Sequence, residues 1–207
     1  MDWQLDAAEV RVLGSLMEKE AATPEYYPLS LNALVNACNQ KSNREPMTSY
    51  DDATVESALE GLRAKGLAMR VTGRDSRVPK HEQRFSERFN LGRREGAILC
   101  VLMLRGPQTV GELRGRAERI YTFDDLEGVE STLHKLADAG FVRQLPRQAG
   151  YKEQRWAHLL SGDVDLSEPA PPSAQDRGPS DRERIARLEL ELAELRREFE
   201  EFRATLR

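Results

Sequence analysis

One stretch of this sequence occurs twice in closely similar form. Residues 51–71 read DDATVESALEGLRAKGLAMRV, and residues 125–145 read DLEGVESTLHKLADAGFVRQL. A fixed offset across several positions indicates two copies of one structural unit. The matching pairs, each 74 residues apart, are Asp51 and Asp125, Val55 and Val129, Leu59 and Leu133, Leu62 and Leu136, Gly66 and Gly140, and Leu67 and Phe141.

Each copy predicts a helix that passes directly into a strand. In the first copy Val55, Leu59 and Leu62 lie on one helical face, Asp51 is a suitable N-cap, and Gly66 is a suitable helix end. A helix that runs into a short strand and a basic hairpin is typical of a winged-helix domain after its third helix. Another small α+β domain with the same helix–glycine–strand corner is the alternative.

The flanking sequence supports the same fold in both copies. Asp6, Ser30 and Thr109 are predicted N-caps of further helices, and the nearly all-apolar residues 97–103 predict a central, buried helix. Residues 67–71 and 80–85 predict one hairpin; residues 141–146 and 151–160 predict the second. We therefore expect a mostly α (α+β) fold with two tandem winged-helix domains, residues 1–91 and 92–160.

The C-terminal part of the chain has a different character. Residues 161–180 are rich in proline, serine and acidic residues and predict a flexible linker. Residues 181–207 predict a coiled-coil helix, in which oppositely charged g and e positions favour a parallel homodimer. A single helix packed on its own body is the alternative. The apolar seam comprises Ile185, Leu188, Leu192, Leu195, Phe199, Phe202 and Leu206.

Composition excludes several classes of protein. No stretch approaches the roughly 20 apolar residues of a membrane span, and the N-terminus lacks the features of a signal peptide, so a cytoplasmic protein without membrane contact is expected. Cys38 and Cys100 lie in apolar helical patterns and are expected to be buried, reduced thiols. No residue spacing suits a metal, a cofactor or a catalytic group, so we expect no enzyme.

The net charge of −4 is unevenly distributed. Residues 1–91 hold 14 acidic and 12 basic side chains, residues 92–160 hold 9 and 11, and residues 161–207 hold 12 and 8. The two predicted domains are therefore close to neutral, and the acidic excess lies in the C-terminal part.

Three segments also carry a family resemblance. These are EVRVLGSLMEKE at residues 9–20, TPEYYPLSLNALVNACNQKSNREP at 23–46, and ATVESALEGLRAKGLAMRV at 53–71, which continues into GRDSRVPKHEQRF. With them the chain resembles the YceH-like family of bacterial proteins, which carry a domain of unknown function numbered 480. The resemblance extends over the second unit and the C-terminal helix. It implies a tandem winged-helix fold and supplies no functional residues.

The first functional hypothesis is a DNA-binding protein that resembles a transcriptional regulator. A winged helix places its third helix in the major groove and its wing on the DNA backbone, where arginine and lysine bind phosphate. Candidate contacts lie before the third helix and on both hairpins. They are Lys41, Asn43, Arg44, Ser49, Arg70, Arg74, Arg77, Lys80, Arg143, Arg147 and Lys152.

The second hypothesis is a protein-binding scaffold. The predicted third helices carry acidic residues at exposed positions, including Glu56 and Glu60 in the first copy and Glu127 and Glu130 in the second. Carboxylates would be repelled by phosphate, which weighs against ordinary readout of a DNA sequence. Winged helices serve as scaffolds in the tandem winged-helix subunits of chromosome-condensation complexes, and near-neutral domains with a coiled coil would suit that role.

Overall fold

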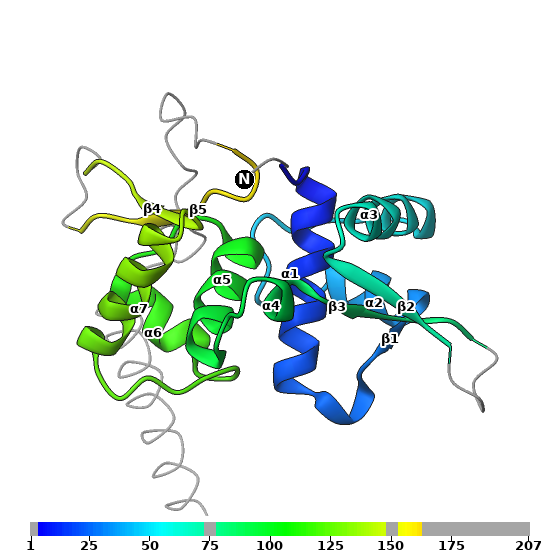
Figure 1. Ribbon diagram of the computed structural model, residues 1–207, viewed down its shortest axis with the longest axis horizontal. Helices are drawn as coiled ribbons and strands as arrows, with labels where there is room; N and C mark the ends of the chain where they lie inside the picture. Colours follow the sequence, from blue (N-terminus) through cyan, green and yellow to red (C-terminus); the bar gives the residue numbers. More distant parts are fainter. Residues whose placement is uncertain (1–3, 73–77, 148–152, 163–207) are drawn as a thin grey trace, which may run out of the picture. The chain divides into compact units, whose positions relative to one another are not determined.

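A computed structural model describes residues 4–72, 78–147 and 153–162 (Figure 1). All of them belong to one compact unit, Met1–Pro169, and the second unit, Ala170–Arg207, lies outside the described residues. Residues 163–180 of the predicted linker and the seven residues of the predicted coiled-coil seam also lie outside the described residues. The described part is a mixed α+β structure of helices and small sheets, as expected.

The elements occur in a similar order in the two halves of the described unit. The first half contains α1 (Ala7–Ala22), the short 3-10 helix η1 (Pro24–Tyr26), β1 (Leu29–Ser30), α2 (Leu31–Cys38), α3 (Asp52–Ala64), β2 (Ala68–Val71), β3 (Lys80–Gln83) and α4 (Phe85–Arg88). The second half contains α5 (Arg93–Arg105), α6 (Val110–Ala117), α7 (Leu126–Asp138), β4 (Val142–Gln144) and β5 (Trp156–His158).

The predicted helix caps are confirmed. Asp6 and Thr109 each form a capping box with the glutamate three residues later, so two N–H groups at each helix start are bound. Ser30, Asp51 and Asp125 accept a backbone N–H from the third residue after them. These short-range bonds fix where α1, α2, α3, α6 and α7 begin.

The two copies of the repeat form the same corner. Gly66 and Gly140 have φ angles of 70° and 76°, which only glycine adopts without a steric penalty. The N–H of Leu67 donates to the carbonyl of Leu62, and the N–H of Phe141 donates to that of Leu136, both at 2.8 Å. Each helix therefore ends in the same hydrogen-bonded glycine motif and turns directly into a strand.

The hairpins are shorter than the sequence predicts. The first sheet has the order β1-β3-β2, and its return strand ends at Gln83 because Phe85 begins α4 with a fully buried ring. In the second sheet β5 covers only Trp156–His158 of the predicted residues 151–160. A bridge between Gln108 and Trp156 lies where the first half has its β1–β3 pair.

The core forms where α1 packs against α5, at the centre of the described unit (Figure 1). As predicted, α5 is central, since every residue from Ala97 to Leu104 is buried. The crossing is close at Gly14, where an added Cβ would lie 3.0 Å from Leu104 and 3.1 Å from Met103. Glycine at this position therefore lets the two helix backbones approach each other.

Both cysteines are buried and free, as expected. Burial raises the pKa of both thiols, and Sγ of Cys100 donates to the carbonyl of Gly14 at 3.4 Å. A protonated, enclosed thiol is a poor nucleophile, so both residues serve packing.

No helix in the described ranges is long and apolar enough to cross a membrane.

Candidate functional site

The β2–β3 hairpin carries the first group of predicted phosphate contacts. Arg70 is exposed on β2, and Lys80 is partly exposed at the start of β3. Arg70 lies opposite His81 in the strand register, so the two side chains project from the same face of the sheet. The predicted wing residues Arg74 and Arg77 lie outside the described residues.

The pKa of His81 depends on its burial and on the charged side chains near this hairpin. Its Nδ1 is buried and has no hydrogen-bond partner in the described part of the chain. Its pKa is lowered, first by burial and then by the positive charges of Arg63 and Arg70, against a smaller opposite effect of Glu56. Two arginines, Arg63 and Arg70, therefore lie close enough to His81 to affect it, and Arg63 also forms an ion pair with Glu60 at 3.7 Å.

The connection between α2 and α3 requires a correction for Arg44. Its side chain is fully buried, with its guanidinium nitrogens 2.6 and 3.2 Å from the two Glu18 carboxylate oxygens. It also donates to the carbonyl of Ala37 at 3.0 and 2.8 Å and to that of Asn43 at 2.9 Å. Because its hydrogen-bonding capacity is used inside the protein, Arg44 is a structural residue and the prediction of a phosphate contact was wrong.

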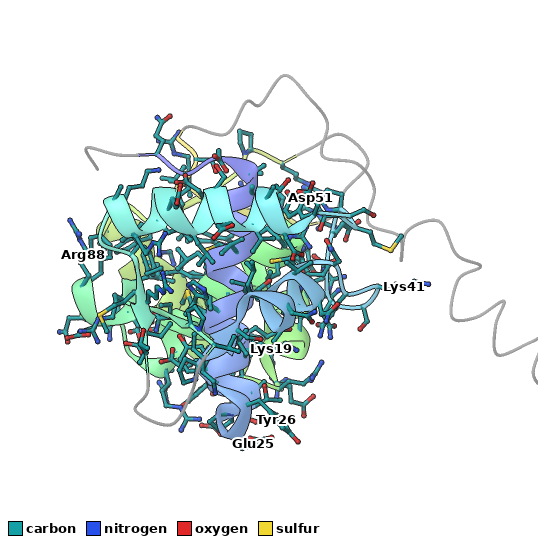
Figure 2. The ribbon with its side chains drawn as sticks, turned by 90° about the vertical axis from the view of Figure 1, so that its right-hand side faces the viewer. Lys19, Glu25, Tyr26, Lys41, Asp51 and Arg88 are labelled. Carbon is teal, nitrogen blue, oxygen red and sulfur yellow. The ribbon has the colours of Figure 1, made fainter. Side chains whose placement is uncertain are left out.

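The same connection is attached to the second half of the described unit. The side-chain oxygen of Asn43 accepts from Arg105, and the N–H of Glu45 donates to the carbonyl of Leu104 at 2.8 Å. Lys41 and Ser49 are exposed, and Figure 2 shows Lys41 pointing away from the body. Two of the four candidates in this connection thus remain open to a partner.

The second hairpin carries the remaining predicted contacts. Arg143 is exposed on β4 and Arg147 is exposed just beyond it, whereas Lys152 lies outside the described residues. A further arginine that the sequence did not single out, Arg155, donates to Glu112 at 2.9 Å and to the carbonyl of Pro107 at 3.0 Å. Arg155 therefore fastens the return strand to the start of α6.

The two basic hairpins do not form one continuous surface. β3 packs against α1, and β5 packs against α5. In Figure 1 the β2–β3 hairpin lies on one side of the α1–α5 pair and the β4–β5 hairpin on the other. The structure thus places the sequence candidates in two separate groups.

Acidic side chains line the exposed faces of the third helix in each half. Asp51 caps the start of α3, as Figure 2 shows, and bonds from the hydroxyl and N–H of Thr54 lower the pKa of its carboxyl. The side chain of Leu126, at the start of α7, is 47% exposed beside this acidic face. The exposed carboxylates are Asp51, Asp52, Glu56 and Glu60 for α3, and Asp125, Glu127, Glu130 and Asp138 for α7.

Sequence patterns missed a set of buried polar residues on α1. Glu9 binds Lys65, and Nη2 of Arg11 donates to the carbonyl of Pro46 at 2.6 Å. Glu18 binds Arg44, as described above. The partners lie 26 to 56 residues away along the chain, so no local spacing could reveal them. Four polar residues of α1 are buried: Glu9, Arg11, Ser15 and Glu18.

The described residues contain no cluster of three or more histidine, cysteine, aspartate or glutamate side chains that could hold a metal ion.

A family model described as "Protein of unknown function, DUF480" matches residues 5–151. The chain belongs to this family. The resemblance found in the sequence motifs is thereby confirmed.

Relatives match this member of the family over most of its length. A "UPF0502 protein" from Solibacter usitatus is 73% identical over 203 residues, which cover 98% of both chains. Another from Citrifermentans bemidjiense is 55% identical and covers 93% of this chain and 90% of its own. A third from Opitutus terrae is 56% identical over 84% of this chain and 78% of its own.

Proposed function

We propose that this protein is a non-enzymatic protein-binding scaffold whose partner surfaces are the exposed faces of α3 and α7. The observation that carries the proposal is that both faces are lined by exposed carboxylates. A partner with basic side chains complements such a surface, whereas the phosphates of DNA are repelled by it.

We further propose that each half of the described unit is a winged helix. The order α1, β1, α2, α3, β2, β3 and the sheet order β1-β3-β2 support this assignment in the first half. In the second half α5, α6, α7, β4 and β5 follow in the same sequence, and the Gln108–Trp156 bridge takes the place of the first strand. In this assignment α3 and α7 are the third helices, which would enter the major groove if the units bound DNA in the usual way.

Two observations favour a protein partner over base readout. Carboxylates such as Glu56 and Glu60 occupy the outer face of α3, where arginine, asparagine or glutamine would be needed to read bases. Arg44, which precedes α3, is bound to Glu18 inside the protein and supplies no free cation.

We also propose that residues 181–207 pair two copies of the chain through a parallel coiled coil. The support is the heptad spacing of the apolar seam from Ile185 to Leu206, with attractive g–e charge pairs. A dimer would present two copies of each acidic face and so strengthen binding to a partner with repeated basic sites. Deleting residues 181–207 should halve the mass measured by sedimentation, and a truncated protein that remains dimeric would contradict the coiled-coil assignment.

DNA binding through the first hairpin is the second candidate function. The observation that favours it is the group of cations near His81, with Arg70 exposed and Arg63 close enough to lower the histidine pKa. Such a protein would hold the DNA backbone with its wing, as some transcriptional regulators do, and leave the bases unread by α3. Its binding would fall steeply as salt rises.

One pair of measurements separates the two candidates. Fluorescence anisotropy of a labelled random-sequence duplex, at low and near-physiological salt, measures DNA binding. Photo-crosslinkers placed at Ser57 on α3 and Ser131 on α7, both exposed, capture protein partners in cells of the source organism. A scaffold predicts a defined crosslinked protein and no salt-sensitive duplex binding.

Charge reversal tests whether the captured protein uses the acidic faces. The variant Glu56→Lys with Glu130→Lys should abolish the crosslinked product. The control Glu25→Lys with Glu118→Lys changes the net charge equally at exposed positions outside α3 and α7 and should leave it unchanged. Micromolar duplex binding that is lost in Arg70→Ala with Arg74→Ala and Arg77→Ala would instead establish the second candidate.

A further inference from the structure

A cavity of about 390 Å³ lies where the two halves of the described unit meet. Its walls come from the last turn of α1, the start of η1, the connection from α4 to α5, the first turns of α5, and Ile120 after α6. The volume lies in the range of roughly 300–1,000 Å³ that is usual for small-molecule sites. The apolar part of the wall is formed by Met17, Ala21, Pro24, Leu91, Ala97 and Ile120.

Two side chains of opposite charge border this apolar wall. Glu20 lies near the end of α1, and Arg93 is the first residue of α5. They form no ion pair with each other. Both residues are exposed, at the rim of the cavity. Oε2 of Glu20 accepts from Nε2 of Gln83 at 2.6 Å, while the side chain of Arg93 forms no hydrogen bond or ion pair with the described residues. The cavity therefore offers one carboxylate oxygen and one guanidinium to a ligand.

We infer that this cavity binds a small zwitterion with an apolar side chain, of the α-amino-acid class. The ligand carboxylate is bound by the guanidinium of Arg93, its ammonium group by the carboxylate of Glu20, and its side chain by the apolar wall. A purely anionic ligand would be repelled by Glu20, and a purely cationic one by Arg93. A ligand that carries both charges satisfies both residues at once.

Such a ligand would touch α1 and α5 together, and it would bind only while the two helices keep this arrangement. Binding to the folded state alone raises the unfolding temperature, and the rise grows with the logarithm of the ligand concentration once this exceeds the dissociation constant. The site lies apart from the exposed faces of α3 and α7, so it stands whether or not these faces bind a protein.

Gly96 provides a way to close the cavity without changing its charges. An added Cβ at Gly96 would have only the Met17 methyl group near it, at 3.8 Å, so a larger side chain there grows into the cavity. Gly96→Leu should therefore exclude the ligand. Gly96→Ala leaves most of the space free and is the matched control, which should bind the ligand nearly as well as the unchanged protein.

The test is isothermal titration of the full chain with phenylalanine and leucine, alongside three comparison compounds. Phenylpropionate lacks the ammonium group, phenethylamine lacks the carboxylate, and glycine lacks the apolar side chain. Phenylalanine or leucine should bind, and each comparison compound should bind at least about tenfold more weakly. Arg93→Gln and Glu20→Gln should each weaken binding by about tenfold, while Arg119→Gln, an exposed arginine outside the cavity wall, should leave it unchanged.

Three results would overturn the inference. One is the absence of binding to any apolar amino acid at millimolar concentration by folded protein. Another is equal binding of phenethylamine or phenylpropionate, because the paired charges would then play no part. The third is unchanged affinity in a folded Gly96→Leu variant, because the ligand would then occupy another site.

Discussion

The two central helices, α1 and α5, are buried by different means. From Ala97 to Leu104, α5 buries apolar side chains and the Cys100 thiol. In α1, Glu9, Arg11 and Glu18 are also buried, and each has a partner far away in the sequence. The buried face of α5 thus consists almost entirely of apolar side chains, whereas α1 also buries charged side chains that bind distant partners.

The difference follows from the loops that each half must hold. Residues 39–50 form a long connection before α3, in which Arg11 donates to the carbonyl of Pro46 and Arg44 donates to that of Asn43. In the connection before α7, the carbonyl of Asp124 accepts a hydrogen bond at 2.7 Å from Arg114, an exposed residue of α6. Backbone carbonyls that face the protein interior need donors from buried side chains, whereas carbonyls at the surface can be bound by exposed side chains.

The largest effect is expected where the polar packing of α1 is broken. Glu18→Ala leaves the guanidinium of Arg44 buried without its carboxylate, which should cost about 3–5 kcal/mol of the free energy of unfolding. Urea denaturation measures the loss. The control is Glu60→Ala, which removes the exposed partner of Arg63 and should change stability by less than about 0.5 kcal/mol. Equal effects of the two variants would show that the buried pair is not what holds α1.

The apolar side of the comparison is tested at the helix crossing. Gly14→Leu forces a side chain against Leu104 and Met103 and should cost about 1–3 kcal/mol. Adding Leu104→Ala should recover part of that loss, which a double-mutant cycle of unfolding free energies reveals. Gly111→Leu in α6, where an added Cβ meets nothing within 4 Å, is the matched control. Strict additivity of the two core substitutions would contradict the close crossing.

Each return strand carries a histidine, His81 on β3 and His158 on β5, and both predict that the stability of the protein depends on pH. Burial lowers the pKa of His158 to about 4, and its Nδ1 has no hydrogen-bond partner among the described residues. The unfolded chain binds a proton near pH 6.5 and the folded chain only near 4, so stability present above pH 6.5 is lost as the pH falls through this window.

The expected loss at His158 is about 1–2 kcal/mol between pH 7 and pH 4.5, after allowance for the partly exposed ring. Chemical denaturation at both values measures it, and His158→Gln should reduce the loss. His81→Gln should act in the same direction, because burial and two arginines lower the pKa of His81 as well. An unchanged pH dependence in the His158 variant would show that protonation of His158 does not cause the loss of stability.

The smallest effect concerns the caps of the repeated helix. Oδ1 of Asp51 accepts from both the N–H and the hydroxyl of Thr54, whereas Oδ1 of Asp125 accepts from the N–H of Gly128. Asp51→Ala should therefore lower the unfolding temperature slightly more than Asp125→Ala. Thr54→Val, which removes only the hydroxyl, should make the two cap substitutions equal. A larger effect at Asp125 would show that the two corners are not equivalent.

Much of the fold could be predicted from the sequence because the signals are local. Asp6 with Glu9 and Thr109 with Glu112 mark helix starts within four residues, and Gly66 and Gly140 mark helix ends. The strands were harder to bound, since nothing local shows that Phe85 leaves β3 to bury its ring at the start of α4. β1 escaped prediction because its two residues form a strand only through their pairing with β3.

The candidate site could be predicted less well than the fold. Exposed positions such as Glu56 and Arg70 follow from helix and strand periodicity. Arg44 does not, because an arginine in a polar loop has the same local sequence whether it reaches solvent or a buried carboxylate. Its partner, Glu18, lies 26 residues earlier in the chain. The two oppositely charged residues beside the cavity, Glu20 and Arg93, lie still further apart in the sequence.

By itself, the sequence determined the repeat, the helix caps, the glycine corners and the acidic character of α3 and α7. Each of these depends on residues that are neighbours along the chain, so backbone geometry and periodicity suffice. Only the tertiary structure decided that α1 and α5 form the shared core, that Arg44 lies inside, and that the two basic hairpins lie apart. These features depend on contacts between distant segments, which form only when the apolar faces of both halves are buried together.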